Sequence, residues 1–100
     1  MAVTFVLDMP GVTRAQLDAL DGQIGVGPGE SPAGQIAHIE AITPDGARII
    51  DVWESEEAYG RFMTERAGPV LAAAGLPAID PPPMHPVHRI FVAKDAPGAR

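Results

Sequence analysis

The chain has no cysteine, few basic residues and no long apolar stretch, and each shortage excludes a class of protein. Without cysteine, neither disulfide bridges nor thiolate metal sites can form. Seven Lys and Arg stand against thirteen Asp and Glu, and the net charge of −6 argues against binding to nucleic acid or to an anionic membrane. The apolar runs are far shorter than the ~20 residues that span a bilayer. We therefore expect no nucleic-acid partner and no membrane partner.

The N-terminus does not read as a secretory signal, because a basic segment followed by a long apolar stretch is missing. We therefore expect a cytoplasmic protein. At 100 residues the chain should form a single domain that spans residues 1–100. A domain of this size buries only ~60–65% of its unfolded surface, so a monomer would be marginally stable.

The apolar pattern predicts the element order strand, helix, strand, strand, helix, strand. The predicted strands are rich in Val, Ile and aromatic residues and cover residues 2–7, 35–43, 47–54 and 86–93. Thr13 and Gln16 form a capping box at the start of the first helix, and Ser55 caps the second. The order βαββαβ predicts an α+β, ferredoxin-like fold, in which two helices cover one face of a four-stranded antiparallel sheet.

Glycine and proline interrupt the pattern at two places. Residues 22–34 are rich in glycine and are predicted to be a loop, and their glycine spacing lacks the strand-to-helix context of a nucleotide site. Gly68 and Pro69 interrupt the second helix, where we expect a kink or a new turn with Pro69 at its first position. Gly75 is suited to end this helix. No P-loop and no nucleophile elbow is present.

The predicted strands are apolar on both faces, although two helices can cover only one. A strand that is apolar on both sides needs cover on both. A second copy of the chain is the simplest cover. The sequence therefore predicts a homodimer, in which two sheets face each other and enclose a cavity.

The hairpin between residues 35 and 54 predicts which side chains share a face. A loop of two or four residues pairs Ile42 with Ala47, Glu40 with Ile49, His38 with Asp51, and Ile36 with Trp53. One face then carries His38, Glu40, Asp51 and Trp53 together. An odd loop length would move Asp51 to the face opposite His38.

The opposite face of this hairpin carries smaller aliphatic residues, namely Ala37, Ile39, Ile50 and Val52. Because helices pack well on such residues, we expect the helices on that side. His38 and its neighbours would then face the cavity enclosed by the dimer.

The polar residues of this face could support proton transfer. A histidine beside a carboxylate is held in one tautomer and becomes more basic, as a proton-abstracting base requires, so His38 and Asp51 are the candidate pair. Trp53 offers a flat apolar wall for an aromatic substrate. The alternative is that His38 and Asp51 form a polar contact near a dimer interface, with Trp53 in the core.

Other candidate residues lie on the second helix and the last strand. Tyr59 either brings its phenol to the cavity mouth or packs beside Phe62. His88 could face the cavity as a second acid or base. His85 and His88 are three residues apart, which on a strand places them on opposite sides, so we expect no metal site.

Several short motifs resemble those of one family. The segment 51–59, Asp-Val-Trp-Glu-Ser-Glu-Glu-Ala-Tyr, followed by Arg61-Phe62, resembles the antibiotic biosynthesis monooxygenase-like group of the dimeric α/β-barrel superfamily. Residues 36–38, 69–71, 75–77 and 86–88 are similar to a small actinobacterial branch of that group. The resemblance covers most of the chain.

The resemblance implies a swapped or face-to-face dimer with a pocket in each protomer, between sheet and helices. Some members of the family oxygenate polycyclic aromatic phenols without metal or flavin, using the substrate carbanion to reduce dioxygen. His38, Asp51 and Trp53 would then act as base, orienting group and wall. Other members degrade haem with a histidine of the second helix, but residues 55–75 contain none. Further members are cyclases, isomerases or ligand-binding proteins.

The resulting hypothesis is a cofactor-independent monooxygenase-like enzyme that acts on an aromatic or polyketide-type small molecule. The predicted catalytic residues are His38, Asp51 and His88. The predicted substrate-binding residues are Trp53, Glu40, Tyr59 and Phe62. The alternatives are a non-catalytic ligand-binding or scaffolding dimer, a haem-binding protein that uses His38 or His88, and a cyclase or isomerase.

Overall fold

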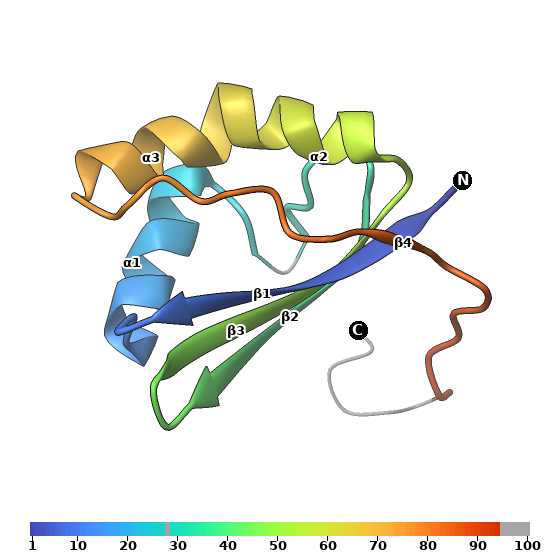
Figure 1. Cartoon of the computed structure of the whole chain (residues 1–100), viewed down its shortest axis with the longest axis horizontal. Helices are drawn as coiled ribbons and strands as arrows, with labels where there is room; N and C mark the ends of the chain where they lie inside the picture. Colours follow the sequence, from blue (N-terminus) through green and yellow to red (C-terminus); the bar gives the residue numbers. More distant parts are fainter. Residues whose placement is uncertain (28, 95–100) are drawn as a thin grey trace.

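A four-stranded antiparallel sheet in the order β2-β3-β1-β4 organises the chain, which the computed structural model describes over residues 1–27 and 29–94 (Figure 1). The strands are β1 (Val3–Pro10), β2 (Gln35–Thr43), β3 (Gly46–Trp53) and β4 (His85–Pro86). The helical segments are α1 (Arg14–Ile24), α2 (Glu56–Phe62), the π-helical η1 (Met63–Ala67) and α3 (Gly68–Ala73). Since α2, η1 and α3 are continuous, the order is βαββαβ, and the predicted ferredoxin-like fold is confirmed.

Both predicted helix caps are present. Thr13 Oγ1 accepts a hydrogen bond from the Gln16 N–H at 3.2 Å, and Gln16 Oε1 accepts one from the Thr13 N–H at 2.8 Å. Ser55 Oγ accepts from the Ala58 N–H at 3.1 Å. These bonds satisfy backbone donors that have no partner within the first turn of a helix, and they fix where α1 and α2 begin.

The second predicted helix continues across the Gly68-Pro69 pair because a π-helical turn, η1, precedes it. The Gly68 N–H donates to the Met63 carbonyl, five residues earlier, and α3 then begins with Pro69 in its first turn. A Cβ atom at position 68 would lie 2.5 Å from the Met63 oxygen, so glycine permits this close approach. The interruption is therefore absorbed by a wider turn. Within the described ranges, no helix is both long enough and apolar enough to cross a bilayer.

The β2–β3 register agrees with the predicted one over most of its length. Ile42 pairs with Ala47, Glu40 with Ile49, and His38 with Asp51, as expected. The expected pairing of Ile36 with Trp53 is wrong. The register shifts between Gln35 and Ala37, so Gln35 opposes Trp53 and Ile36 is the extra residue of a β-bulge.

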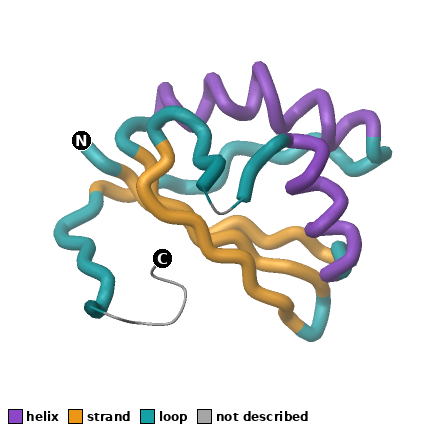
Figure 2. Tube along the Cα trace, turned by 180° about the vertical axis from the view of Figure 1, so that it is seen from behind, coloured by secondary structure: helices purple, strands orange, loops and turns teal. Residues whose placement is uncertain are grey.

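The helices cover the sheet face opposite to the one predicted. In Figures 1 and 2 the helices lie on one side of the sheet, with α1 at one end and α2 to α3 running across it. The covered face carries the buried Asp51 and Trp53, whereas Ile39 on the other face is 53% exposed. Aromatic packing explains the choice, since Trp53 and Phe5 meet Tyr59 of α2 on the covered side. His38 and Glu40, which share the face of Asp51, therefore lie between sheet and helices and not between two sheets.

The last strand is much shorter than predicted. Only His85 and Pro86 pair with β1, at Thr4 and Val3. Before His85, residues 81–83 are all proline, which has no N–H to donate to a neighbouring strand. Beyond Val87, whose N–H donates to the Ala2 carbonyl, the segment runs past the N-terminal end of β1 and has no strand to pair with. Ile90, Phe91 and Val92 consequently leave the sheet with exposed side chains, at 45%, 83% and 64%.

Candidate functional site

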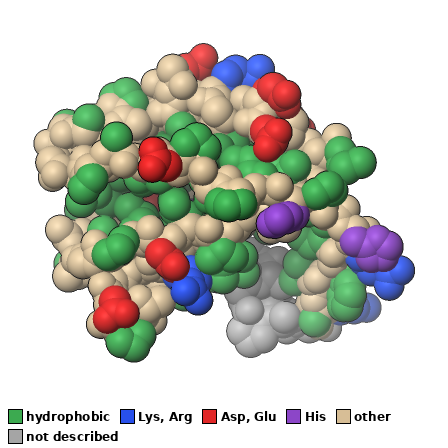
Figure 3. All heavy atoms as spheres, viewed as in Figure 1, with side chains coloured by type: hydrophobic (Ala, Val, Ile, Leu, Met, Phe, Trp, Pro, Cys, Tyr) green, Lys and Arg blue, Asp and Glu red, His purple; other side chains and the backbone are tan. Residues whose placement is uncertain are grey.

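The pocket that contains the predicted polar residues lies between the sheet and the helices. It has a volume of about 90 Å³ and opens to solvent on one side. Its apolar wall includes Phe5, Leu7, Leu17, Leu20, Ile49 and Leu71. Its polar residues are Asp21, Gln35, His38, Glu40, Asp51 and Tyr59. Figure 3 shows the surface hollowed between α1 and the strands, with hydrophobic side chains around the hollow.

Asp51 is the buried centre of the polar cluster. Its carboxylate accepts a hydrogen bond from His38 Nδ1 at 2.6 Å and another from Trp53 Nε1 at 2.9 Å. The Asp51 side chain is 5% exposed, so both bonds form away from bulk water. A buried carboxylate needs such partners, and the two donors hold it rigidly in the sheet.

His38 lies between two carboxylates. Its Nε2 is 3.0 Å from Glu40 Oε2, while its Nδ1 faces Asp51. The hydrogen bond to Asp51 is the main cause that raises the pKa of His38 to about 9, with a further contribution from Glu40, and burial opposes both. At neutral pH the imidazole therefore carries two protons and donates one to each carboxylate.

Asp21 extends the cluster from α1. The pKa of Asp21 is raised to about 7, mainly by burial and also by hydrogen bonding to the neighbouring Glu40. The cluster thus contains three carboxyl groups and one imidazole, contributed by α1, β2 and β3. The pKa of Asp21, at about 7, lies near neutral pH, as a group that transfers protons requires.

Tyr59 and Phe62 line the pocket and also pack in the core. The ring centroid of Tyr59 lies 4.7 Å from that of Phe5 and 5.6 Å from that of Trp53. Phe62 lies 5.2 Å from Trp53 by the same measure. Burial raises the pKa of Tyr59 to about 12, so its phenol stays neutral.

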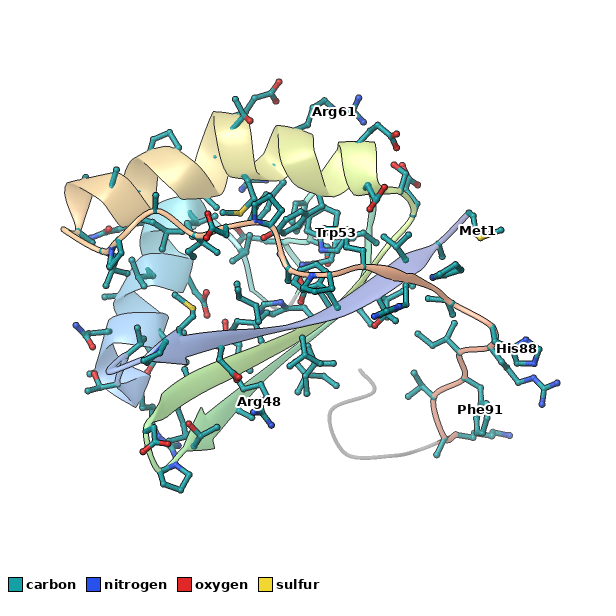
Figure 4. The ribbon with its side chains drawn as sticks, viewed as in Figure 1. Met1, Arg48, Trp53, Arg61, His88 and Phe91 are labelled. Carbon is teal, nitrogen blue, oxygen red and sulfur yellow. The ribbon has the colours of Figure 1, made fainter. Side chains whose placement is uncertain are left out.

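The structure places two other predicted residues away from the pocket. Trp53 is fully buried behind the pocket wall, where its N–H holds Asp51, so it orients the cluster and is not itself a wall (Figure 4). His88 is exposed on the segment that follows β4, and Figure 4 shows it pointing away from the sheet. The structure thus brings together His38, Glu40, Asp51, Tyr59 and Phe62, but not His88.

Sequence reasoning missed Asp21 and Gln35. Asp21 could have been noticed, because it follows Leu17 and Leu20 at helical spacing and interrupts the apolar stripe of α1 with a charge. Gln35 had no such signal, since its place at the pocket depends on the bulge at Ile36.

Comparison with known proteins supports the fold. No protein-family model matches the chain, and no curated protein matches it. Among solved structures, the chain is similar to a Chloroflexus aurantiacus J-10-fl protein provisionally named an antibiotic biosynthesis monooxygenase, with 24% sequence identity and a TM-score of 0.61. The match covers 93% of this chain and 100% of the other. At this identity the likeness establishes a common fold, the ferredoxin-like arrangement of the monooxygenase-like protein.

Proposed function

We propose that this protein is a monooxygenase-like enzyme that removes a proton from a small, mostly apolar or aromatic substrate without a cofactor. The observation that carries the proposal is the His38 cluster, a charged imidazole between two carboxylates at the side of an apolar pocket. Apolar walls would hold the substrate, while the polar groups accept its proton and stabilise the resulting anion. Electron transfer from that anion to dioxygen would give a substrate radical and superoxide. Formation of a C–O bond between them, protonation of the resulting peroxide and loss of water would complete an oxygenation.

The protonation of His38 refines its proposed role. With both ring nitrogens bonded to carboxylates, the imidazole has no free lone pair to accept a substrate proton or to bind a haem iron. We therefore assign proton acceptance to the carboxylates. His38 would keep them oriented and offset their mutual repulsion.

The pocket favours a substrate smaller than a polycyclic polyketide. Its volume is about 90 Å³, whereas pockets for drug-sized ligands range from roughly 300 to 1,000 Å³. Even a benzene-sized ligand has been accommodated in a cavity of about 150 Å³. A short enolisable ketone fits this space best, and a single-ring phenol would fit only with part of its ring in the pocket mouth.

The proposal includes a homodimer. Val6 and Ile39 on the uncovered sheet face are 52% and 53% exposed, and Ile50 and Val52 lie beside them. Such a contiguous apolar surface is typical of an interaction site. We propose that a second copy covers it. The exposed Ile90, Phe91 and Val92 would add apolar surface to the same contact.

The test measures proton abstraction and oxygen consumption separately. Deuterium incorporation into acetylacetone, a small carbon acid, is followed by NMR, and oxygen uptake is measured with single-ring hydroquinones. The wild-type protein should accelerate both. His38→Gln should slow both at least tenfold, whereas His85→Gln, at an exposed histidine of β4, should leave both rates unchanged. No acceleration by the wild-type protein would contradict the proposed function.

A further inference from the structure

Asp21 occupies an unusual position for a carboxyl group. It lies in the last turn of α1, one residue after the buried Leu20 and four after the buried Leu17. The residue is half-buried and lines the pocket together with these leucines. Aspartate is rarely placed on the apolar stripe of a helix, because its charge loses hydration there.

The neighbours of Asp21 are mostly negative. Its carboxyl group is within hydrogen-bonding reach of Glu40 on β2, and Asp18 on α1 adds a further negative charge. His38 on β2 supplies the opposing positive charge. Two carboxyl groups in contact hold one proton between them more readily than either holds one alone. Together with burial, this contact keeps the pKa of Asp21 at about 7.

Asp21 also differs from the other carboxylates in how it is bonded. Asp51 is held by His38 and Trp53, and Glu40 is held by His38. Among the described contacts, neither His38 nitrogen faces Asp21. Asp21 can therefore exchange a proton with a bound molecule without breaking the His38 bonds.

We infer that Asp21 is the group that takes the proton of the substrate in this pocket, with Glu40 behind it as the relay to water and His38 as a positioning residue. In the step, the C–H or O–H bond of the substrate breaks and its electron pair stays on the substrate as an enolate or phenolate. A new O–H bond forms on Asp21, and the proton then passes by way of Glu40 to water. This inference rests on the proposed function and adds the acceptor to it.

The first test needs no turnover. Carbon-detected NMR follows the side-chain carboxyl of Asp21 from pH 3 to pH 10 in the wild-type protein, in Glu40→Gln and in Asp18→Asn. We expect a midpoint near 7 in the wild type. Glu40→Gln should lower the midpoint clearly, because the contacting carboxyl is lost, and Asp18→Asn should lower it far less. A wild-type midpoint near 4 would overturn the inference.

The second test uses deuterium incorporation into acetylacetone. Asp21→Asn should slow the protein-dependent rate by about 10² to 10⁴, and Asp21→Glu should restore part of it. Asp18→Asn, one turn earlier on an exposed part of α1, should keep the rate within about twofold. Full activity of Asp21→Asn would refute only the role of Asp21 and leave the proposed function standing. An inactive wild-type protein would refute the proposed function itself.

Discussion

Asp51→Asn should destabilise the protein through two side chains at once. The carboxylate accepts hydrogen bonds from His38 Nδ1 and Trp53 Nε1, at 2.6 and 2.9 Å. An amide of the same shape has one oxygen and one NH₂ group, so it can accept from only one of these donors in the same way. With the charge gone, His38 loses the main partner that keeps it protonated.

The magnitude follows from the His38 pKa. A rise from 6.5 to about 9 corresponds to about 3–4 kcal/mol, which is an upper limit for Asp51 because Glu40 supplies part of the rise. Because the His38 side chain is 31% exposed, solvent screening reduces this to roughly 1–2 kcal/mol. The lost bond from Trp53 to a charged acceptor adds about 1–2 kcal/mol. We therefore expect Asp51→Asn to lower the free energy of unfolding by about 2–4 kcal/mol at pH 7.

Urea unfolding at fixed protein concentration provides the measurement. Trp53 is the single tryptophan of the chain, so its fluorescence reports the core next to the mutation, and circular dichroism reports the helices. Asp80→Asn, at an exposed aspartate, should change the free energy of unfolding by less than about 0.5 kcal/mol. A loss below about 1 kcal/mol for Asp51→Asn would refute the reasoning.

The same variant should show a defined pH dependence. The pKa of His38 is higher in the folded protein than in the unfolded chain. The contribution of His38 to the free energy of unfolding is therefore complete below pH 6.5 and disappears as the pH rises through about 9. The stability difference between wild type and Asp51→Asn should therefore be larger at pH 6 than at pH 10. In the variant, the NMR midpoint of His38 should fall from about 9 towards 6.5. An unchanged midpoint would mean that Asp51 does not hold the charge of His38.

Three further variants test packing and assembly. Gly68→Ala places a methyl group 2.5 Å from the Met63 oxygen and should destabilise the π turn by about 1–3 kcal/mol. The expected result is a lower midpoint of thermal unfolding. An unchanged midpoint would contradict the close approach of position 68 to Met63. Trp53→Phe keeps an aromatic ring but removes the N–H bonded to Asp51, so it should cost about 1–2 kcal/mol in a denaturant titration followed by circular dichroism. Ile39→Lys puts a charge on the uncovered sheet face and should give the mass of a monomer in light scattering, whereas a dimeric mass would place the interface elsewhere.

Local features of the sequence determined the elements and most of the hairpin. Thr13, Gln16 and Ser55 fix the helix starts through bonds to the nearest backbone groups, and such bonds depend only on neighbouring residues. The two-residue turn at residues 44–45 sets the pairing of His38 with Asp51, because strand register propagates from the turn. The central pair of the candidate site could therefore be predicted before any tertiary contact was known.

Tertiary structure alone decided which sheet face the helices cover and how long the last strand is. Both faces are apolar, so periodicity could not choose between them, and the packing of Trp53 against Tyr59 made the choice. The predicted strand at 86–93 satisfied its local pattern, but β1 begins at Val3 and offers no partner beyond Val87. Tertiary structure also decided that Asp21 belongs to the site. Its contact with Glu40 links a helix to a distant strand, and no spacing along the chain encodes that distance.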